Sequence, residues 1–159
     1  MASPARETSL YPFTSFRFAV AINVPAIGPD PLCHAAFAEC DGLEMTVDVK
    51  TIREGGNNAA QIRLLGAVNY SLLTLKRGMT ANFDLWNWFD LLYEEGMRAP
   101  RGDVTVTSFA SDGVTEQVQF FLENCLPTKL KAPPLNARDG VVAIEELQLS
   151  YEWMSRVKP

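Results

Sequence analysis

The segment DVTVTSFASDGVTEQVQFFLE, residues 103–123, carries the clearest secondary-structure pattern in this chain. Apolar and polar residues alternate on both sides of Asp112-Gly113, a dipeptide typical of tight hairpin turns. The segment therefore predicts two antiparallel strands, over 103–109 and 115–123. On the second strand, a polar face opposite the apolar one is formed by Gln117, Gln119 and Glu123.

Similar patterns extend outward in both directions along the chain. Further strands are predicted over 16–24, 36–40, 45–54, 60–65, 70–77 and 141–153, separated mainly by Gly and Pro turns. The last strand has an apolar face made of Leu147, Leu149, Tyr151 and Trp153, and a polar face made of Glu146, Gln148, Ser150 and Glu152. Residues 127–134 contain Pro127, Pro133 and Pro134, which predicts a broken segment at a sheet edge.

A single helix is predicted over 83–95, after a possible N-cap at 80–82 and before Gly96. Its apolar residues form two rows, with Trp86 in one and Trp88 in the other. The helix is therefore either nearly enclosed by its own domain or contacts a neighbouring subunit with one row. We expect both tryptophans to anchor the helix on the core. Roughly seven or eight strands and one helix predict a mainly β fold, an antiparallel barrel or sandwich.

Residues 45–65 predict a hairpin that projects from the domain. Its tip, GGNN at 55–58, consists of residues that tolerate positive backbone dihedral angles. Its strands are rich in Thr, Val and charged residues, with little separation of apolar from polar positions. Because paired strands without a packed face are marginally stable, we expect this hairpin to extend into solvent or to be covered by another chain.

The length of 159 residues is typical of one domain, which we place at 15–159 after an extended N-terminal arm over 1–14. The formal net charge of -5 argues against stable nucleic-acid binding, which requires clustered Lys and Arg. The apolar stretch 16–24 lacks the features of a secretory signal and is too short to span a bilayer, so we expect no membrane anchor.

No residue pattern indicates catalysis. His34, the only histidine, lies in a Pro-rich loop without an accompanying motif, and Glu145 and Glu146 point to opposite faces of one strand. No CxxC pair is formed by the three cysteines, Cys33, Cys40 and Cys125. We therefore expect no enzyme activity, no cofactor and no metal site, and small half-buried thiols in a reducing cytosol.

Several motifs together resemble one protein family. They are FRF at 16–18, FAECDGLE at 37–44, REGGN at 53–57, LTLKRGMT at 73–80, LWNW at 85–88, NCLPTK at 124–129 and AIEEL at 143–147. In this order they resemble the tail-tube proteins of contractile injection systems and contractile phage tails, which are similar in fold to the tube protein of type VI secretion. The chain departs from the family at Leu65, where a proline commonly precedes the glycine.

The resemblance implies a structural subunit that forms hexameric rings, stacked into a tube that sheath contraction drives through a target envelope. Implied partners are further copies of the chain, the sheath, the baseplate or spike, a terminator and cargo in the lumen. Such particles assemble in the bacterial cytoplasm and are released or act at the cell envelope. Contacts between rings or subunits are expected at Arg53, Glu54, Gly55, Gly56, Asn57, Lys76 and Arg77. Lumen-facing candidates are Gln117, Gln119, Glu123, Glu146, Gln148 and Glu152.

A second interpretation is a small β-barrel that binds a ligand in its interior, with the same alternation of polar and apolar residues. An enzyme is a third. The feature that separates the first two is the hairpin over 45–65, for which a monomeric barrel has no use.

Overall fold

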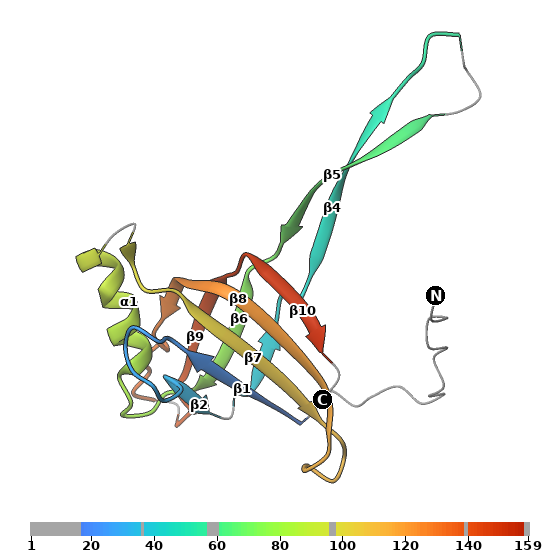
Figure 1. Cartoon of the computed structure of the whole chain (residues 1–159). Helices are drawn as coiled ribbons and strands as arrows, with labels where there is room; N and C mark the ends of the chain where they lie inside the picture. The colour runs from blue at the N-terminus through green and yellow to red at the C-terminus, as the bar shows by residue number, and fades with distance from the viewer. Residues whose placement is uncertain (1–16, 36, 57–60, 96–97, 139, 158–159) are drawn as a thin grey trace.

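The computed structural model describes residues 17–35, 37–56, 61–95, 98–138 and 140–157. Two of the elements form a hairpin that extends far from the body of the molecule, and the helix lies at one end of the body (Figure 1). The elements, in chain order, are β1 (Phe18–Asn23), β2 (Cys33–Ala35), β3 (Glu39–Asp41), β4 (Met45–Ile52), β5 (Ile62–Tyr70), β6 (Leu73–Gly78), α1 (Asp84–Glu95), β7 (Gly102–Phe109), β8 (Glu116–Lys131), β9 (Ile144–Ser150) and β10 (Trp153–Val157).

All the strand pairs found in the described ranges are antiparallel. Eight strands form one sheet, with seven in the order β2–β1–β7–β8–β9–β6–β3 and with β10 paired to β8. Strands β4 and β5 form a separate two-stranded sheet, called here the projecting hairpin. The predicted fold class is confirmed: the described chain is mainly β and antiparallel, with a single helix.

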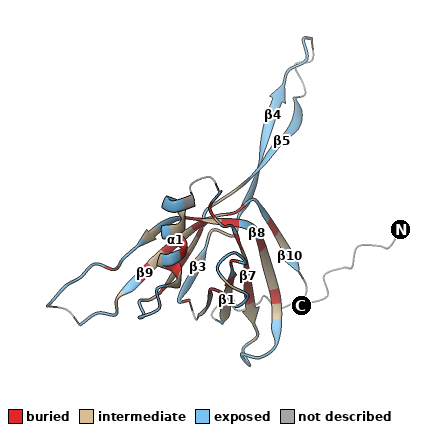
Figure 2. Cartoon of the chain, turned by 60° about the vertical axis from the view of Figure 1, so that its left-hand side comes forward, coloured by how far each residue is buried: buried red, intermediate tan, exposed pale blue. Residues whose placement is uncertain are grey.

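The core is formed by alternate residues of the strands that surround it. Strand β6 turns Leu73 and Leu75 inward, and its partner β9 turns Leu147 and Leu149 inward. From the other side of the core, Val20 and Ile22 of β1 join the same cluster, as does Leu122 of β8. Buried residues are thus concentrated in the body, whereas the projecting hairpin is almost entirely exposed (Figure 2).

The prediction of a broken edge segment over 127–134 is wrong about the break in its first part. Strand β8 continues through Pro127 to Lys131, where it pairs with β9 on one side, while its pairing with β7 ends at Cys125. The register shifts between Pro127 and Lys129. An irregularity at this position accommodates a residue that has no backbone N–H to donate to the ladder.

The strand predicted over 141–153 is two strands that follow the same side of β8. β9 ends at Ser150 and β10 begins at Trp153. Opposite this break, Asn124 of β8 has a φ of 55°, and the Glu152 N–H donates to the Glu123 carbonyl. Because of this break Trp153, predicted on the buried face, is 56% exposed, and Met154 is buried instead.

Two other boundaries also differ from prediction. Instead of one strand over 36–40, β2 lies before that range and β3 lies at its end, so His34 belongs to a strand and not to a loop. Residues 71 and 72 divide the strand predicted over 70–77. Gly42, with a φ of +95°, packs at this division, where an added Cβ would lie 2.0 Å from the Leu72 carbonyl oxygen. Only glycine fits this close approach.

Candidate functional site

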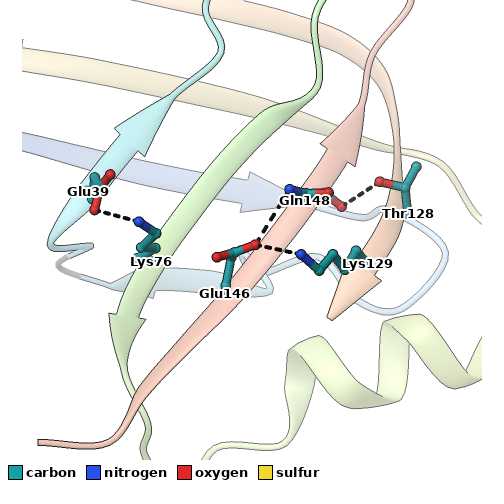
Figure 3. A network of polar contacts seen from close by, with 6 residues as sticks. All are labelled: Glu39, Lys76, Thr128, Lys129, Glu146 and Gln148. Atoms are coloured by element: carbon teal, nitrogen blue, oxygen red, sulfur yellow. Dashed lines mark hydrogen bonds and ion pairs between the residues drawn. The ribbon is translucent and has the colours of Figure 1, made fainter. Parts of the chain in front are cut away.

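A row of alternating charges crosses four adjacent strands on the face of the sheet that points away from the core (Figure 3). The register places Glu39 of β3 opposite Lys76 of β6, Lys76 opposite Glu146 of β9, and Glu146 opposite Lys131 of β8. The Lys76 ammonium donates to the Glu39 carboxylate at 2.9 Å, and the Lys129 ammonium donates to Glu146 at 3.0 Å. We call this set, together with Gln148 and Thr128, the charged face.

The charged groups of this face shift one another's pKa values. The pKa of Lys76 is raised, first by its hydrogen bond to Glu39 and then by the negative charge of the same residue. The pKa of Glu146 is lowered, chiefly by the hydrogen bond from Lys129. Both shifts favour the charged forms, so the row keeps its alternation of sign at neutral pH.

The predicted lumen-facing residues lie in three places. Glu146 and Gln148 belong to the charged face, where the Gln148 carbonyl accepts from the Thr128 hydroxyl at 3.2 Å. Gln117, Gln119 and Glu123 lie on the first half of β8, before the bend at Asn124. Glu152 forms a separate cluster at that bend, where it accepts from Arg101 at 2.6 Å and from the Asn124 side chain at 3.2 Å. The charged face therefore contains only two of the six candidates.

Arg77 is not available for a contact with a neighbouring subunit, and the structure corrects that expectation. Arg77 is only 4% exposed, and its side chain forms an ion pair with the equally buried Glu145 of the paired strand β9. The guanidinium also lies 5.9 Å from the centre of the Phe37 ring. Sequence spacing could not show this pairing, because the two residues are 68 positions apart. Lys76, in contrast, points to the charged face and remains partly exposed.

The projecting hairpin carries a cluster of apolar residues on one face that depends on its strand register. Val47 and Val49 of β4 pair with Val68 and Leu65 of β5, so one extra residue of β5 lies between these pairs as a bulge. The bulge brings Leu65, which is 82% exposed, onto the same face as the valines. The hairpin therefore has an exposed apolar face, formed by Met45, Val47, Val49, Leu65 and Val68. Ile52, Ile62 and Leu64 are exposed on the opposite face, so the apolar residues are concentrated on one face but not confined to it.

The residues at the tip of this hairpin are exposed and belong to no strand. Arg53, Glu54, Gly55 and Gly56 follow the end of β4, and Gly56 has a φ of +97°. Asn57, the remaining candidate at the tip, lies outside the described residues.

The two helix tryptophans differ in their surroundings. Trp88 is fully buried, and its indole Nε1 donates to the Pro100 carbonyl at 2.9 Å. Trp86 is half-buried, and the exposed residues Phe83 and Tyr93 lie near the two ends of α1. Trp88 thus has the contacts of an anchor, and the helix retains a partly exposed aromatic row.

The described residues give no indication of a metal or redox centre. They contain no group of three or more His, Cys, Asp or Glu side chains able to hold a metal ion. Burial raises the pKa of the Cys40 and Cys125 thiols to about 12, which keeps both protonated at neutral pH. No helix within the described ranges is long and apolar enough to cross a membrane.

Comparison with known proteins gives consistent matches. The family model described as T4-like virus tail tube protein gp19 matches residues 14–155. A chain in the cryo-EM structure of the anti-feeding prophage baseplate is 28% identical, with a TM-score of 0.79 over 99% of this chain and 98% of that one. A chain in the sheath-tube complex of the extracellular contractile injection system PVC is 19% identical, with a TM-score of 0.80 over the full length of both.

A more distant fold match is Hcp1 from Flavobacterium johnsoniae, at 12% identity and a TM-score of 0.52, over 91% of this chain and 97% of that one. No match was found among the curated proteins.

Proposed function

Because this chain belongs to the family of the T4-like virus tail tube protein gp19, we propose that its copies form hexameric rings that stack into the hollow inner tube of a contractile injection particle. Sheath contraction would drive this tube through a target envelope and deliver the cargo of its lumen. The role is structural and requires no catalytic site or cofactor.

The observation that carries this proposal is the exposed apolar face of the projecting hairpin. The five large apolar residues of this face are exposed and do not pack against the core of their own chain. Contiguous apolar surface of this kind marks an interaction site, and a two-stranded hairpin needs a packed face to be stable. A neighbouring ring of the same chain would supply that cover, with Arg53, Glu54 and the glycine tip at the end of the contact.

The remaining surfaces have roles consistent with such a tube. The charged face, with Glu146 and Gln148, would line the lumen, and α1 would lie on the outer side toward the sheath. The similar structures are those of a sheath-tube complex, a baseplate and a tube-terminating cap. We propose the corresponding sheath, baseplate and terminator proteins as partners of this chain, assembled in the bacterial cytoplasm and then released or active at the cell envelope.

The ligand-binding barrel is less well supported. Its binding site would occupy the interior, but Ile22, Leu122 and Leu149 are fully buried there and belong to one packed cluster. A barrel whose interior is filled by side chains has no room for a ligand.

The test compares two adjacent leucines on opposite faces of the hairpin. Leu65→Glu places a charge on the apolar face, whereas Leu64→Glu places it on the other face, opposite Lys50. By negative-stain microscopy and sedimentation, we expect the wild-type chain and Leu64→Glu to form tubes and Leu65→Glu to stop at single rings. Tubes of unchanged length from Leu65→Glu would contradict the role of the hairpin. A wild-type chain that remains monomeric at high concentration would contradict the tube itself.

A further inference from the structure

The projecting hairpin joins the body of the molecule through two short segments. Residues 42–44 connect β3 to β4, and residues 71 and 72 connect β5 to β6. We call these two segments the hairpin root. In the described ranges neither β4 nor β5 pairs with a strand of the body. The direction in which the hairpin leaves the body is therefore set mainly at the root.

Tyr151 contacts both segments of the chain that meet at the root. It is buried and belongs to the turn between β9 and β10, which lies beside the base of the hairpin (Figure 1). Its hydroxyl lies 2.8 Å from the Gly42 carbonyl oxygen and 3.2 Å from that of Glu44, so it can donate to either. Its ring packs against the ring of Tyr70, the last residue of β5, with ring centres 5.3 Å apart.

Other contacts join the two segments of the root to each other. The Glu44 carbonyl accepts from the Ser71 N–H at 3.2 Å, and the Glu44 carboxylate accepts from the Ser71 hydroxyl at 3.0 Å. The pKa of Tyr151 is raised, chiefly by burial, so its hydroxyl keeps its proton at neutral pH and remains a donor. The root is thus tied together, and Tyr151 ties it to the body.

The length of the hairpin amplifies any movement at the root. Strand β4 has eight residues, which span about 26 Å at about 3.3 Å per residue. A tilt of about 10° at the root would therefore move the far end by about 4–5 Å, close to the spacing of two paired strands. A displacement of this size would misplace the apolar face against the surface that covers it.

We infer that Tyr151 is a positioning residue for the projecting hairpin: its hydroxyl fixes the root, so that the apolar face meets a neighbouring ring in one direction. The inference rests on the proposed function and goes beyond it, because it assigns the direction of the hairpin to a residue outside the hairpin. A hairpin already held in the binding orientation associates more tightly than one that visits this orientation for only part of the time.

Tyr151→Phe tests this inference, because it removes the hydroxyl and keeps the ring. Tyr70→Phe is the matched control, since it removes the hydroxyl of the other ring, for which no hydrogen bond is found among the described residues. Double electron–electron resonance measures the distance between spin labels on Glu54→Cys at the exposed hairpin tip and on Asp30→Cys in an exposed loop of the body. The chains are kept dilute enough to sediment as monomers, and Ala first replaces the native cysteines Cys33, Cys40 and Cys125.

We expect a narrow distance distribution for the chain with both tyrosines and for Tyr70→Phe, and a clearly wider one for Tyr151→Phe. Near-UV circular dichroism verifies that both variants keep the folded body. In the unlabelled chain, Tyr151→Phe should form rings at the same concentration as the wild type. It should form tubes only at about a fivefold higher concentration, the factor that corresponds to one typical hydrogen bond when only the correctly oriented hairpin binds.

Each result decides the inference separately from the proposed function. An equally narrow distribution for Tyr151→Phe would overturn it, and so would tubes of Tyr151→Phe at the wild-type concentration. Equal broadening in Tyr70→Phe would assign the effect to the ring pair and overturn the role of the Tyr151 hydroxyl. A wild-type chain that forms no tubes would overturn the proposed function, whereas the distance distributions would still decide whether Tyr151 fixes the hairpin.

Discussion

Breaking the buried ion pair between Arg77 and Glu145 should destabilise the domain far more than removing the pair as a whole. The two side chains are 5% and 3% exposed, and they join adjacent strands in the interior. Glu145→Leu leaves a buried guanidinium without this carboxylate, and Arg77→Met leaves a buried carboxylate without this guanidinium. The double variant leaves neither charge and packs a flexible methionine beside Phe37.

The magnitude follows from the depth of burial. Loss of one partner of a buried pair costs about 3–5 kcal/mol, whereas replacing both partners by apolar residues is often neutral or stabilising. Total domain stability is typically about 5–15 kcal/mol, so each single variant loses a large fraction of it. For a domain of this size, the loss corresponds to a drop in Tm of roughly 10 °C. The coupling energy between the two positions should therefore reach about 3 kcal/mol or more.

The assay is urea unfolding followed by tryptophan fluorescence, with all variants dilute enough to sediment as monomers. Glu152→Leu is the matched control, because it removes a partner of Arg101 from an exposed pair and should cost less than about 1 kcal/mol. Single variants within about 1 kcal/mol of wild type would refute the reasoning, since buried charges cannot be so insensitive. A double variant as unstable as the sum of the single ones would refute it as well.

Two further predictions concern the helix and the β7–β8 turn. Trp88→Ala should lower the free energy of unfolding by about 3–5 kcal/mol, because it empties a fully buried site. Trp86→Ala should lower it clearly less, since Trp86 is half-buried. Similar losses for the two variants in urea unfolding would contradict the assignment of Trp88 as the principal anchor. The pKa of Asp112 is lowered from 3.8 to about 2 by the hydrogen bond from the Thr115 hydroxyl and by the N–H groups of Val114 and Thr115. The contribution of the Asp112 carboxylate to stability is therefore complete above about pH 4 and is lost as the pH falls to about 2. Asp112→Asn should flatten the pH dependence of unfolding free energy in that range, and an unchanged slope would show that the turn does not depend on the carboxylate.

Local patterns were sufficient for most of the fold. Alternation around Asp112-Gly113 predicted β7 and the first half of β8, and the helix was predicted to within one residue at its start. The family resemblance, carried by motifs such as REGGN and LTLKRG, is confirmed by the match over residues 14–155. These features depend on neighbouring residues in the sequence, which is why they could be recognised without coordinates.

The errors came from features that depend on pairing. The sequence predicts a break at Pro127, although a register shift lets β8 continue beyond it. The apolar face of the projecting hairpin depends on a bulge in β5, which no count of apolar residues reveals. The sequence predicts a surface position for Arg77, because its partner Glu145 is distant in sequence. In each case the environment of the residue is determined by the strand beside it.

The core and the charged face are formed by alternate residues of the same strands, so their positions cannot vary independently. Along β9, Leu147 and Leu149 point inward, and Glu146 and Gln148 point outward. A slip of one residue in the pairing of β9 would turn the leucines outward and bury the polar side chains. The charges at Glu146 and its neighbours can therefore be exchanged for others, but their positions on the face are set by the packing of the leucines between them. The spacing of the charges on this face is consequently a property of the core, whereas their sign can be changed at the surface.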